Sequence, residues 1–313
     1  MRACVDIGGT KVAVSLAKAG SRELIARQQA PTAKTGDNDA VAMQVMALID
    51  AACAEAGVSV DSLSGVAVAS AGPFVLKDGC VELANPNICG GIAGPSRGLP
   101  NDWMTALLEA PLRERFGRVR VENDAIAALE AERRWGALQG LDDCAYVTWS
   151  TGVGVGLCVD GRALRGKNGN AGHAGHSFVS TDGDAGDDTP ALCGCGNVGD
   201  VEGLAAGNAI ARRFDQSAAE LFEAAAAGDA KALKRIDALC SVVGRMLYNL
   251  VITLDLQAIS LGGSVFWHNQ DLLLPRLQAE IDGKLPALTQ GVKLIPAGLG
   301  DTVGDHAALA LLD

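Results

Sequence analysis

The sequence predicts an α/β protein of two lobes, and three features of the chain support this fold class. Its 313 residues are enough for two domains that each have a core. Short β-prone runs alternate with longer segments whose apolar residues recur at helical spacing. A unit of strand, polar Gly/Thr turn and strand occurs twice, as VDIGGTKVAVSLA and as TWSTGVGVGLCVD. A duplicated unit predicts one such turn facing inward from each lobe.

The first lobe is expected to begin with three strands, at residues 2–7, 12–17 and 23–29, joined by glycine-bearing turns. A helix should cover 38–57, because Val41, Val45 and Ile49 recur at helical spacing and Gly57 can end it. A buried strand should follow at 64–70. The segment 74–100 is rich in Gly, Pro and Asn, which predicts a loop that carries binding groups.

The second lobe is expected to repeat this order. A strand at 119–122 and a helix at 123–138 precede a hairpin series over 144–166, whose second turn is Asp-Gly. Residues 204–254 should be largely helical, 257–265 a strand with a glycine pair, and 302–312 a closing helix. The predicted N-terminal lobe is therefore 1–121, joined by the C-terminal helix 302–313, and the predicted C-terminal lobe is 122–301.

The composition of the chain argues against several classes of protein. The formal net charge of −11 argues against a nucleic-acid or anionic-membrane surface, because such surfaces need clustered Lys and Arg. Nine cysteines are too few and odd in number for a disulfide scaffold, and the start MRACVDIGGTK has no apolar signal region. No apolar run approaches the roughly 18–20 residues that span a bilayer. These features predict a soluble protein of a reducing, cytoplasmic compartment.

Two nucleotide-binding patterns match only in part. GRALRGKN has Walker A spacing, but Asn168 replaces the magnesium-binding Ser or Thr and no helix is expected to follow. GCGNVG fits G-x-G-x-x-G, but it opens no βαβ unit. We therefore reject both patterns.

The stretch DIGGTK at residues 6–11 is a better candidate for a phosphate site. An acid at the end of a strand, bare turn amides and a hydroxyl can surround a phosphate and its magnesium ion. By itself the stretch is also consistent with a plain hairpin turn. Two further glycine turns, STGVG at 150–154 and LGGS at 261–264, also follow strands and favour a nucleotide held in a cleft.

Asp124 lies in ENDA, at the predicted junction of a strand and a helix. A helix N-terminus stabilises an ionised carboxylate, so Asp124 could accept a proton from a sugar hydroxyl that attacks a γ-phosphate. The alternative is that Asn123 or Asp124 is simply the helix cap.

Two histidines, His173 and His176, lie three apart in GNAGHAGHSFV. This stretch alone leaves metal ligands, sugar contacts and core packing open. Downstream, CGCGNVGD supplies Cys193, Cys195 and Asp200, which with His176 could complete a four-ligand zinc site. Two reduced surface thiols are the alternative, and Asp200 is a harder, less zinc-selective ligand than a thiolate.

Taken in order, DIGGTK, ENDA, STGVGVG, GNAGHAGH, CGCGNVGDVE and LGGSV span nearly the whole chain and resemble the ROK family of sugar kinases. This resemblance implies a duplicated actin-like ATPase fold, related to ribonuclease H, with two lobes and a central cleft. It also implies phosphorylation of a hexose hydroxyl that depends on ATP and Mg²⁺, structural Zn²⁺, and a homodimer.

The resemblance also assigns roles to residues. It makes Asp124 the catalytic base and places Asn123, His176 and Glu202 on the sugar, with Gly72 and Asn85 in sugar-side loops. The ATP site that it implies comprises Asp6, Gly8, Gly9, Thr10, Lys11, Thr151, Gly152, Gly262 and Gly263. The zinc ligands that it implies are His176, Cys193, Cys195 and Asp200.

Two departures from the family pattern are informative. Glucokinase-like members carry Glu where this chain has His173, and AGHxGH resembles bacterial N-acetylmannosamine kinases. An imidazole offers one donor or acceptor per face, so His173 should alter which sugar is preferred. Asp200 replaces the third cysteine of the zinc cluster, and the acidic segment 180–190 is predicted to be a loop.

The leading hypothesis is a kinase that phosphorylates the 6-hydroxyl of N-acetylmannosamine with ATP, as in sialic acid catabolism. A kinase of the same family for glucose, allose or N-acetylglucosamine is the nearest alternative. A non-catalytic sugar sensor is the alternative from another class.

Overall fold

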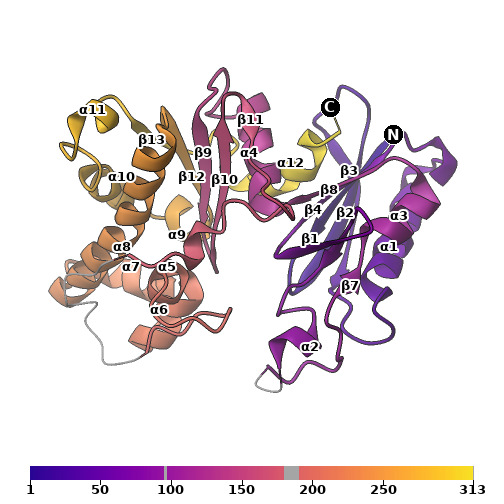
Figure 1. The fold of residues 1–313 in the computed structure, drawn as a ribbon, viewed down its shortest axis with the longest axis horizontal. Coiled ribbons are helices and arrows are strands. Elements are labelled where there is room, and N and C mark those ends of the chain that lie inside the picture. Colours follow the sequence, from indigo (N-terminus) through magenta and orange to yellow (C-terminus); the bar gives the residue numbers. More distant parts are fainter. Residues whose placement is uncertain (95–96, 180–189, 313) are drawn as a thin grey trace. The chain divides into compact units, whose positions relative to one another are not determined.

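The computed structural model describes residues 1–94, 97–179 and 190–312, and these form two compact units (Figure 1). Unit 1 comprises Met1–Ala131, Arg165–Ala171 and Gly304–Asp313, and unit 2 comprises Glu132–Leu164 and Gly172–Val303. The boundary expected after residue 121 lies inside unit 1, because most of the helix that follows belongs to this unit.

Unit 1 is built on a five-stranded sheet of order β3-β2-β1-β4-β8. Strands β1, β2 and β3 form an antiparallel meander, whereas β4 and β8 run parallel to β1. Helix α1 packs on β2 and β3, and α3 packs on β8. The elements are β1 (Arg2–Ile7), β2 (Lys11–Ala17), β3 (Leu24–Pro31), α1 (Ala40–Ala56), η1 (Val60–Ser62), β4 (Val66–Ser70), α3 (Glu109–Phe116), β8 (Val119–Asn123), α4 (Asp124–Trp135) and α12 (Val303–Ala310).

Unit 2 has a second five-stranded sheet, of order β11-β10-β9-β12-β13. Strands β9, β10 and β11 are antiparallel, and β12 and β13 run parallel to β9, so strand order and direction repeat those of unit 1. The predicted duplicated α/β fold is thereby confirmed. The strands are β9 (Cys144–Trp149), β10 (Val153–Val159), β11 (Arg162–Ala163), β12 (Ala258–Gly262) and β13 (Lys293–Pro296).

The helices of unit 2 include one, α8 (Ala230–Leu254), that is long and apolar enough to cross a membrane. Half of its apolar window is buried, and it packs against α5, α7, α10 and α11. It is therefore a core helix rather than a membrane span. The others are η3 (Ala174–His176), α5 (Val201–Ala205), α6 (Gly207–Phe214), α7 (Ala218–Ala226), α9 (Ser264–Trp267), α10 (Gln270–Ala279), α11 (Pro286–Thr289) and η4 (Gly300–Thr302).

The predicted loop at 74–100 is wrong in part. Strands β5 (Phe74–Lys77), β6 (Cys80–Leu83) and β7 (Ala106–Leu107) form a small antiparallel sheet, and α2 (Gly90–Ala93) follows β6. Asp78 and Gly79 both have positive φ, of 50° and 77°, as a two-residue hairpin turn requires. This Asp-Gly pair was the overlooked signal. The predicted acidic loop at 180–190 lies, apart from Pro190, outside the described residues.

Candidate functional site

Three parallel strands of unit 1 end side by side at the first candidate site. Ile7 of β1 pairs with Ser70 of β4, and Ser70 pairs with Asn123 of β8. The carboxyl ends of parallel strands form the usual ligand-binding edge of an α/β sheet. Asp6 and Asp124, which the sequence placed in separate motifs, therefore lie at one edge, close enough for Asp6 to influence the ionisation of Asp124.

The DIGGTK turn joins β1 to β2 and is a tight hairpin turn. The Gly8 N–H donates to the Lys11 carbonyl at 2.8 Å, and the Thr32 hydroxyl donates to the Gly8 carbonyl at 2.7 Å. Gly9 is half-buried against Asn87, whereas Thr10 and Lys11 are exposed. The backbone therefore forms the hairpin turn that the sequence allowed as an alternative. The turn presents the Thr10 hydroxyl and the Lys11 ammonium group to solvent.

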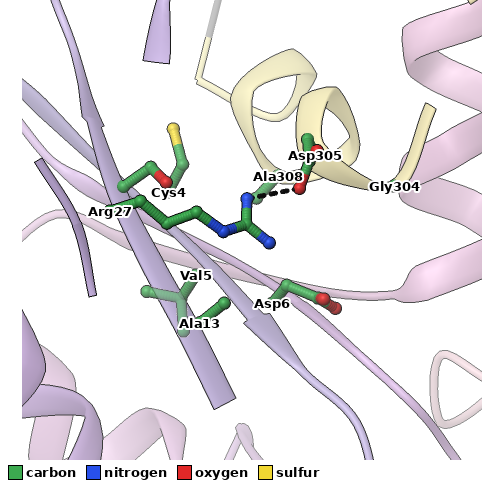
Figure 2. Close-up of a pocket in the computed structure, with 9 residues that line it drawn as sticks. Cys4, Val5, Asp6, Ala13, Arg27, Gly304, Asp305 and Ala308 are labelled. Atoms are coloured by element: carbon green, nitrogen blue, oxygen red, sulfur yellow. Dashed lines mark hydrogen bonds and ion pairs between the residues drawn. The ribbon is translucent and has the colours of Figure 1, made fainter. Parts of the chain in front are cut away.

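Asp6 is half-buried beside a small cavity that Arg27 and Asp305 also line (Figure 2). Burial raises the pKa of the Asp6 carboxyl to about 6; Lys11 and Arg27 oppose this shift, and Asp305 adds to it. Arg27 forms an ion pair with Asp305, which comes from α12. No sequence signal indicated this pair, because its members are 278 residues apart.

Asp124 begins α4 and is exposed, while Asn123 is buried. The Ala125 N–H donates to Asn123 Oδ1 at 3.0 Å and to Asp124 Oδ1 at 2.8 Å, so both side chains take part in capping the helix. The surrounding protein nevertheless displaces water and raises the pKa of Asp124 to about 6; the Ala125 N–H opposes this shift and Asp6 adds to it. A carboxyl with such a pKa is a competent general base near neutral pH.

The two predicted sugar-side loop residues of unit 1, Gly72 and Asn85, are hydrogen-bonded to each other. Asn85 Nδ2 donates to the Gly72 carbonyl at 2.6 Å, and its Oδ1 accepts from the Asn87 N–H at 2.8 Å. Asn85 is buried, and the Gly72–Pro73 peptide is cis. Asn85 therefore organises this loop, whatever else it contacts.

In unit 2 the two other glycine turns lie together at the ends of β9 and β12. Gly262 pairs with Thr148, and a Cβ on Gly263 would lie 2.5 Å from the Trp149 carbonyl oxygen. Gly263 also has a φ of 86°, so a side chain is excluded on both grounds. In the neighbouring turn the Ser150 N–H donates to the Gly152 carbonyl at 2.9 Å, and Thr151 is exposed.

A cavity of about 450 Å³ begins next to this glycine pair. Helix α7 forms one wall and α9 with the residues after it forms the other. The side chains that line it combine small alanines with Phe222, Glu223, Ser264, Val265, His268 and Asn269.

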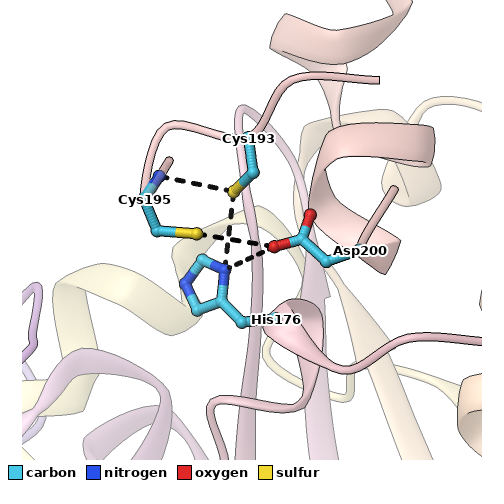
Figure 3. A group of neighbouring side chains, drawn as sticks. All are labelled: His176, Cys193, Cys195 and Asp200. Atoms are coloured by element: carbon cyan, nitrogen blue, oxygen red, sulfur yellow. Dashed lines mark hydrogen bonds and ion pairs between the residues drawn. The ribbon is translucent and has the colours of Figure 1, made fainter. Parts of the chain in front are cut away.

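The predicted zinc ligands form one cluster in unit 2, which Figure 3 shows. His176 Nδ1 lies 3.2 Å from Asp200 Oδ2 and 3.5 Å from Cys193 Sγ, and Cys195 Sγ lies 3.5 Å from Asp200 Oδ2. Around a tetrahedral zinc ion, N and O ligand atoms are about 3.3 Å apart, and S and N or O atoms about 3.5 Å apart. One histidine, two thiols and one carboxylate at these spacings fit a zinc ion.

The protonation of the cluster suits a metal. Burial raises the pKa of the Cys193 thiol. Burial alone would also raise the pKa of Asp200, but donors from Gly203, Cys193 and His176 reverse the effect, and the pKa is lowered. Asp200 is thus held as an anion, whereas Cys193 is a thiol that a bound cation would deprotonate.

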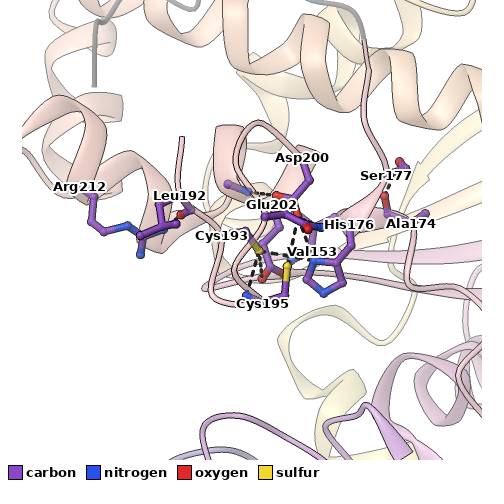
Figure 4. A network of polar contacts seen from close by, with 12 residues as sticks. Val153, Ala174, His176, Ser177, Leu192, Cys193, Cys195, Asp200, Glu202 and Arg212 are labelled. Atoms are coloured by element: carbon purple, nitrogen blue, oxygen red, sulfur yellow. Dashed lines mark hydrogen bonds and ion pairs between the residues drawn. The ribbon is translucent and has the colours of Figure 1, made fainter. Parts of the chain in front are cut away.

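Glu202 links the cluster of predicted zinc ligands to the turn at 150–154 (Figure 4). Its Oε2 accepts from the Val153 N–H at 2.9 Å, and its Oε1 lies 3.5 Å from Cys193 Sγ. A Cβ on Gly152 would lie 2.7 Å from Glu202 Oε2, so this carboxylate rests directly on the predicted phosphate turn.

The two histidines occupy different places. The His176 side chain is 31% exposed and belongs to the cluster of predicted zinc ligands, whereas His173 lies outside that cluster and is half-buried. Their rings stack with centroids 6.0 Å apart. Neither side chain is fully buried, which argues against core packing.

The chain matches the sequence profile of the ROK family over residues 2–313. It is 34% identical to the N-acetylmannosamine kinase of Salmonella newport over 272 residues, which cover 83% of this chain and 82% of that protein. It is 29% identical to the glucokinase of Aeropyrum pernix over 331 residues, which cover 98% of this chain and 95% of the relative.

The solved structures that the chain resembles also include ROK proteins. The chain is similar to the ROK hexokinase from Thermus thermophilus with a TM-score of 0.73 and 32% identity, covering 98% of this chain and 96% of that one. It is also similar to a ROK family glucokinase from Streptomyces griseus in complex with glucose and AMPPNP. That TM-score is 0.72 with 27% identity, and the match covers 99% of this chain and 98% of the other.

Proposed function

The chain belongs to the ROK family of sugar kinases, and we propose that it transfers the γ-phosphoryl group of ATP to the 6-hydroxyl of N-acetylmannosamine. It is an ATP-dependent phosphotransferase. The substrate proposal rests above all on the motif AGHAGH, in which, by its resemblance to the family pattern, His173 takes the place of the Glu of glucokinase-like members. The 34% identity to an N-acetylmannosamine kinase supports it.

Asp124 is the proposed catalytic base. It starts a helix at the carboxyl edge of the unit 1 sheet, and its pKa of about 6 leaves it mainly ionised at pH 7. It would accept the proton of the sugar 6-hydroxyl as that oxygen bonds to the γ-phosphorus and the bond to the ADP oxygen breaks. Asn123, which caps the same helix end, would orient the sugar.

The ATP site would use the three glycine turns. In unit 1, Gly8, Gly9, Thr10 and Lys11 would line the phosphates, and Asp6 would help to hold Mg²⁺. In unit 2, Thr151 and Gly152 would contact the phosphates, and Gly262 and Gly263 would border the adenosine, which the adjoining cavity of about 450 Å³ is large enough to admit. Bound Mg²⁺ supplies neutralisation of the phosphate charge.

Sugar recognition would come from His173, His176 and Glu202, with Gly72 and Asn85 shaping the sugar-side loop. His173 is the proposed specificity residue, since an imidazole replaces a carboxylate that would accept hydrogen bonds from two sugar hydroxyls. We further propose that His176, Cys193, Cys195 and Asp200 hold structural Zn²⁺, and that the enzyme is a cytoplasmic homodimer.

The decisive experiment is ADP release with ATP, Mg²⁺ and a panel of N-acetylmannosamine, glucose, allose and N-acetylglucosamine. N-acetylmannosamine should give the highest kcat/KM. The Asp124→Asn variant should lose at least ~100-fold in kcat, because general-base catalysis contributes that much. Turnover close to wild type in this variant would refute the assigned base, and a preference for glucose would refute the substrate.

Glucose phosphorylation is the second candidate function. It is favoured by the match to Aeropyrum pernix glucokinase over 98% of this chain. The same panel separates the two candidates. Absence of ADP release with every sugar would instead indicate a non-catalytic sugar sensor, which should still bind a sugar in calorimetry.

A further inference from the structure

The segment Arg165–Ala171 belongs to unit 1, although Leu164 before it and Gly172 after it belong to unit 2. It leads directly into His173, the proposed specificity residue. Whatever fixes this segment therefore fixes the start of the loop that carries His173.

Asn170 fixes one end of the segment through both polar atoms of its amide. Its Oδ1 accepts from the Phe74 N–H at 2.7 Å, and its Nδ2 donates to the Phe74 carbonyl at 2.8 Å. This pairing uses the N–H and C=O of one residue, as a neighbouring strand would. An amide is required, because it alone offers a donor and an acceptor side by side at this length.

Arg165 fixes the other end. Its Nε lies 2.8 Å from Glu122 Oε1 and 3.0 Å from Glu122 Oε2, and the Arg165 carbonyl accepts from the Ala171 N–H at 3.0 Å. Glu122 directly precedes Asn123 and Asp124 in β8 and α4. The segment is therefore anchored beside the proposed base at one end and on Phe74 at the other.

The anchors matter because the segment would be poorly ordered without them. Gly169 and Gly172, on either side of Asn170, have φ values of 76° and 91°, a region that glycine enters freely. Such glycines increase the number of conformations available to an untethered loop. The two hydrogen bonds between Asn170 and the backbone of Phe74 select one of these conformations.

Phe74 follows the Gly72–Pro73 peptide, and Gly72 is the residue whose carbonyl Asn85 holds. We propose that Asn170 is a positioning residue for the sugar site. By pairing with Phe74 it fixes the segment that precedes His173 to the loop that carries Gly72 and Asn85. This inference rests on the proposed function, because it assigns both loops to the sugar.

The test compares Asn170→Ala and Asn170→Asp with wild type in the full chain, and Lys167→Ala, which alters an exposed residue of the same segment, is the matched control. Asn170→Asp keeps an acceptor for the Phe74 N–H but has no donor for its carbonyl. Without ligands, hydrogen exchange at the Phe74 amide and over residues 165–176 should be at least ~10-fold faster in Asn170→Ala than in wild type. In Lys167→Ala it should remain as slow as in wild type. Thermal unfolding confirms that each variant is folded.

Steady-state kinetics provides the second readout. The KM for the preferred sugar should rise about tenfold in both Asn170 variants, equivalent to about 1.4 kcal/mol, while the KM for ATP stays within about twofold. Unchanged exchange at Phe74 would overturn the anchoring. Faster exchange with an unchanged sugar KM, or equal increases in both KM values, would overturn the positioning role.

A wild-type protein that phosphorylates no sugar would refute the proposed function and, with it, the link to a sugar site. Hydrogen exchange would then still decide whether Asn170 anchors the segment. The two failures are therefore distinguishable.

Discussion

Glu132 is a fully buried carboxylate of unit 2, and its replacement by Gln should destabilise the protein strongly. Its Oε2 accepts from the Ala137 N–H at 2.9 Å, the Gly298 N–H at 2.9 Å and the Ser260 hydroxyl at 3.0 Å. Its Oε1 accepts from the Leu299 N–H at 2.8 Å. One side chain thus joins the end of α4, strand β12 and the segment that leads into α12.

The cost of Glu132→Gln follows from this arrangement, because all four partners are donors and a Gln amide has only one acceptor oxygen. In its better orientation the new NH₂ group replaces Oε1 and faces the Leu299 N–H. One hydrogen bond to a charged group, worth about 1.5–3 kcal/mol, is lost, and a buried N–H is left without its acceptor at a cost of about 1–3 kcal/mol. Together these effects should lower the free energy of unfolding by about 2.5–6 kcal/mol.

Scanning calorimetry measures this loss. For a unit of this size, at about 2–4 °C per kcal/mol, the Tm should fall by about 5–25 °C in Glu132→Gln. Glu114→Gln, which removes an exposed carboxylate from α3, is the control and should change Tm by less than about 1 °C. A Glu132→Gln protein that unfolds within about 1 °C of wild type would refute the reasoning, because the donors would then have found other acceptors.

Three further predictions concern activity and metal. Because the pKa of Asp124 is raised to about 6, its base form is lost as the pH falls through this value. The kcat/KM should therefore be about tenfold lower at pH 5 than at its plateau. A flat pH profile would contradict the role of Asp124 as the catalytic base. Elemental analysis should find about one zinc per chain in wild type and almost none in Asp200→Ala, whereas equal zinc contents would exclude Asp200 as a ligand. His173→Glu should shift kcat/KM toward glucose and away from N-acetylmannosamine by about tenfold, and an unchanged ratio in the sugar panel would remove His173 from the specificity site.

Local signals in the sequence were sufficient for much of the fold. The helix at Ala40–Ala56 was predicted from Val41, Val45 and Ile49, which share a buried face, and Gly57 ends it in the left-handed conformation. The two copies of strand, turn and strand predicted the duplication of the sheets. The hairpin at Asp78 and Gly79 was also visible, but the glycines and prolines around it obscured it.

The supporting contacts were not predictable, because they join distant residues. Phe74 and Asn170 are 96 residues apart, and Glu132 and Leu299 are 167 apart, so neither pair forms a motif. Motifs supplied the candidate site residues, since chemistry limits which residue types can contact a phosphate, a sugar or a metal. The residues that hold them depend on the register of strands from both halves of the chain.

Asp200 shows how one substitution in a motif can serve two roles. Its Oδ1 accepts from the Gly203 N–H at 2.7 Å and so caps α5, the helix that carries Glu202, while its Oδ2 lies within the ligand cluster. A thiolate has a single sulfur and could not place separate acceptors on both partners. An Asp at this position therefore couples the cluster of predicted zinc ligands to the start of α5, and through Glu202 and the Val153 N–H to the turn that follows β9. Asp200→Cys should accordingly retain zinc but lower the free energy of unfolding by about 1 kcal/mol, the usual value of a helix cap. Urea unfolding of the zinc-loaded variant measures this difference, and a variant at least as stable as wild type would show that the cap contributes nothing.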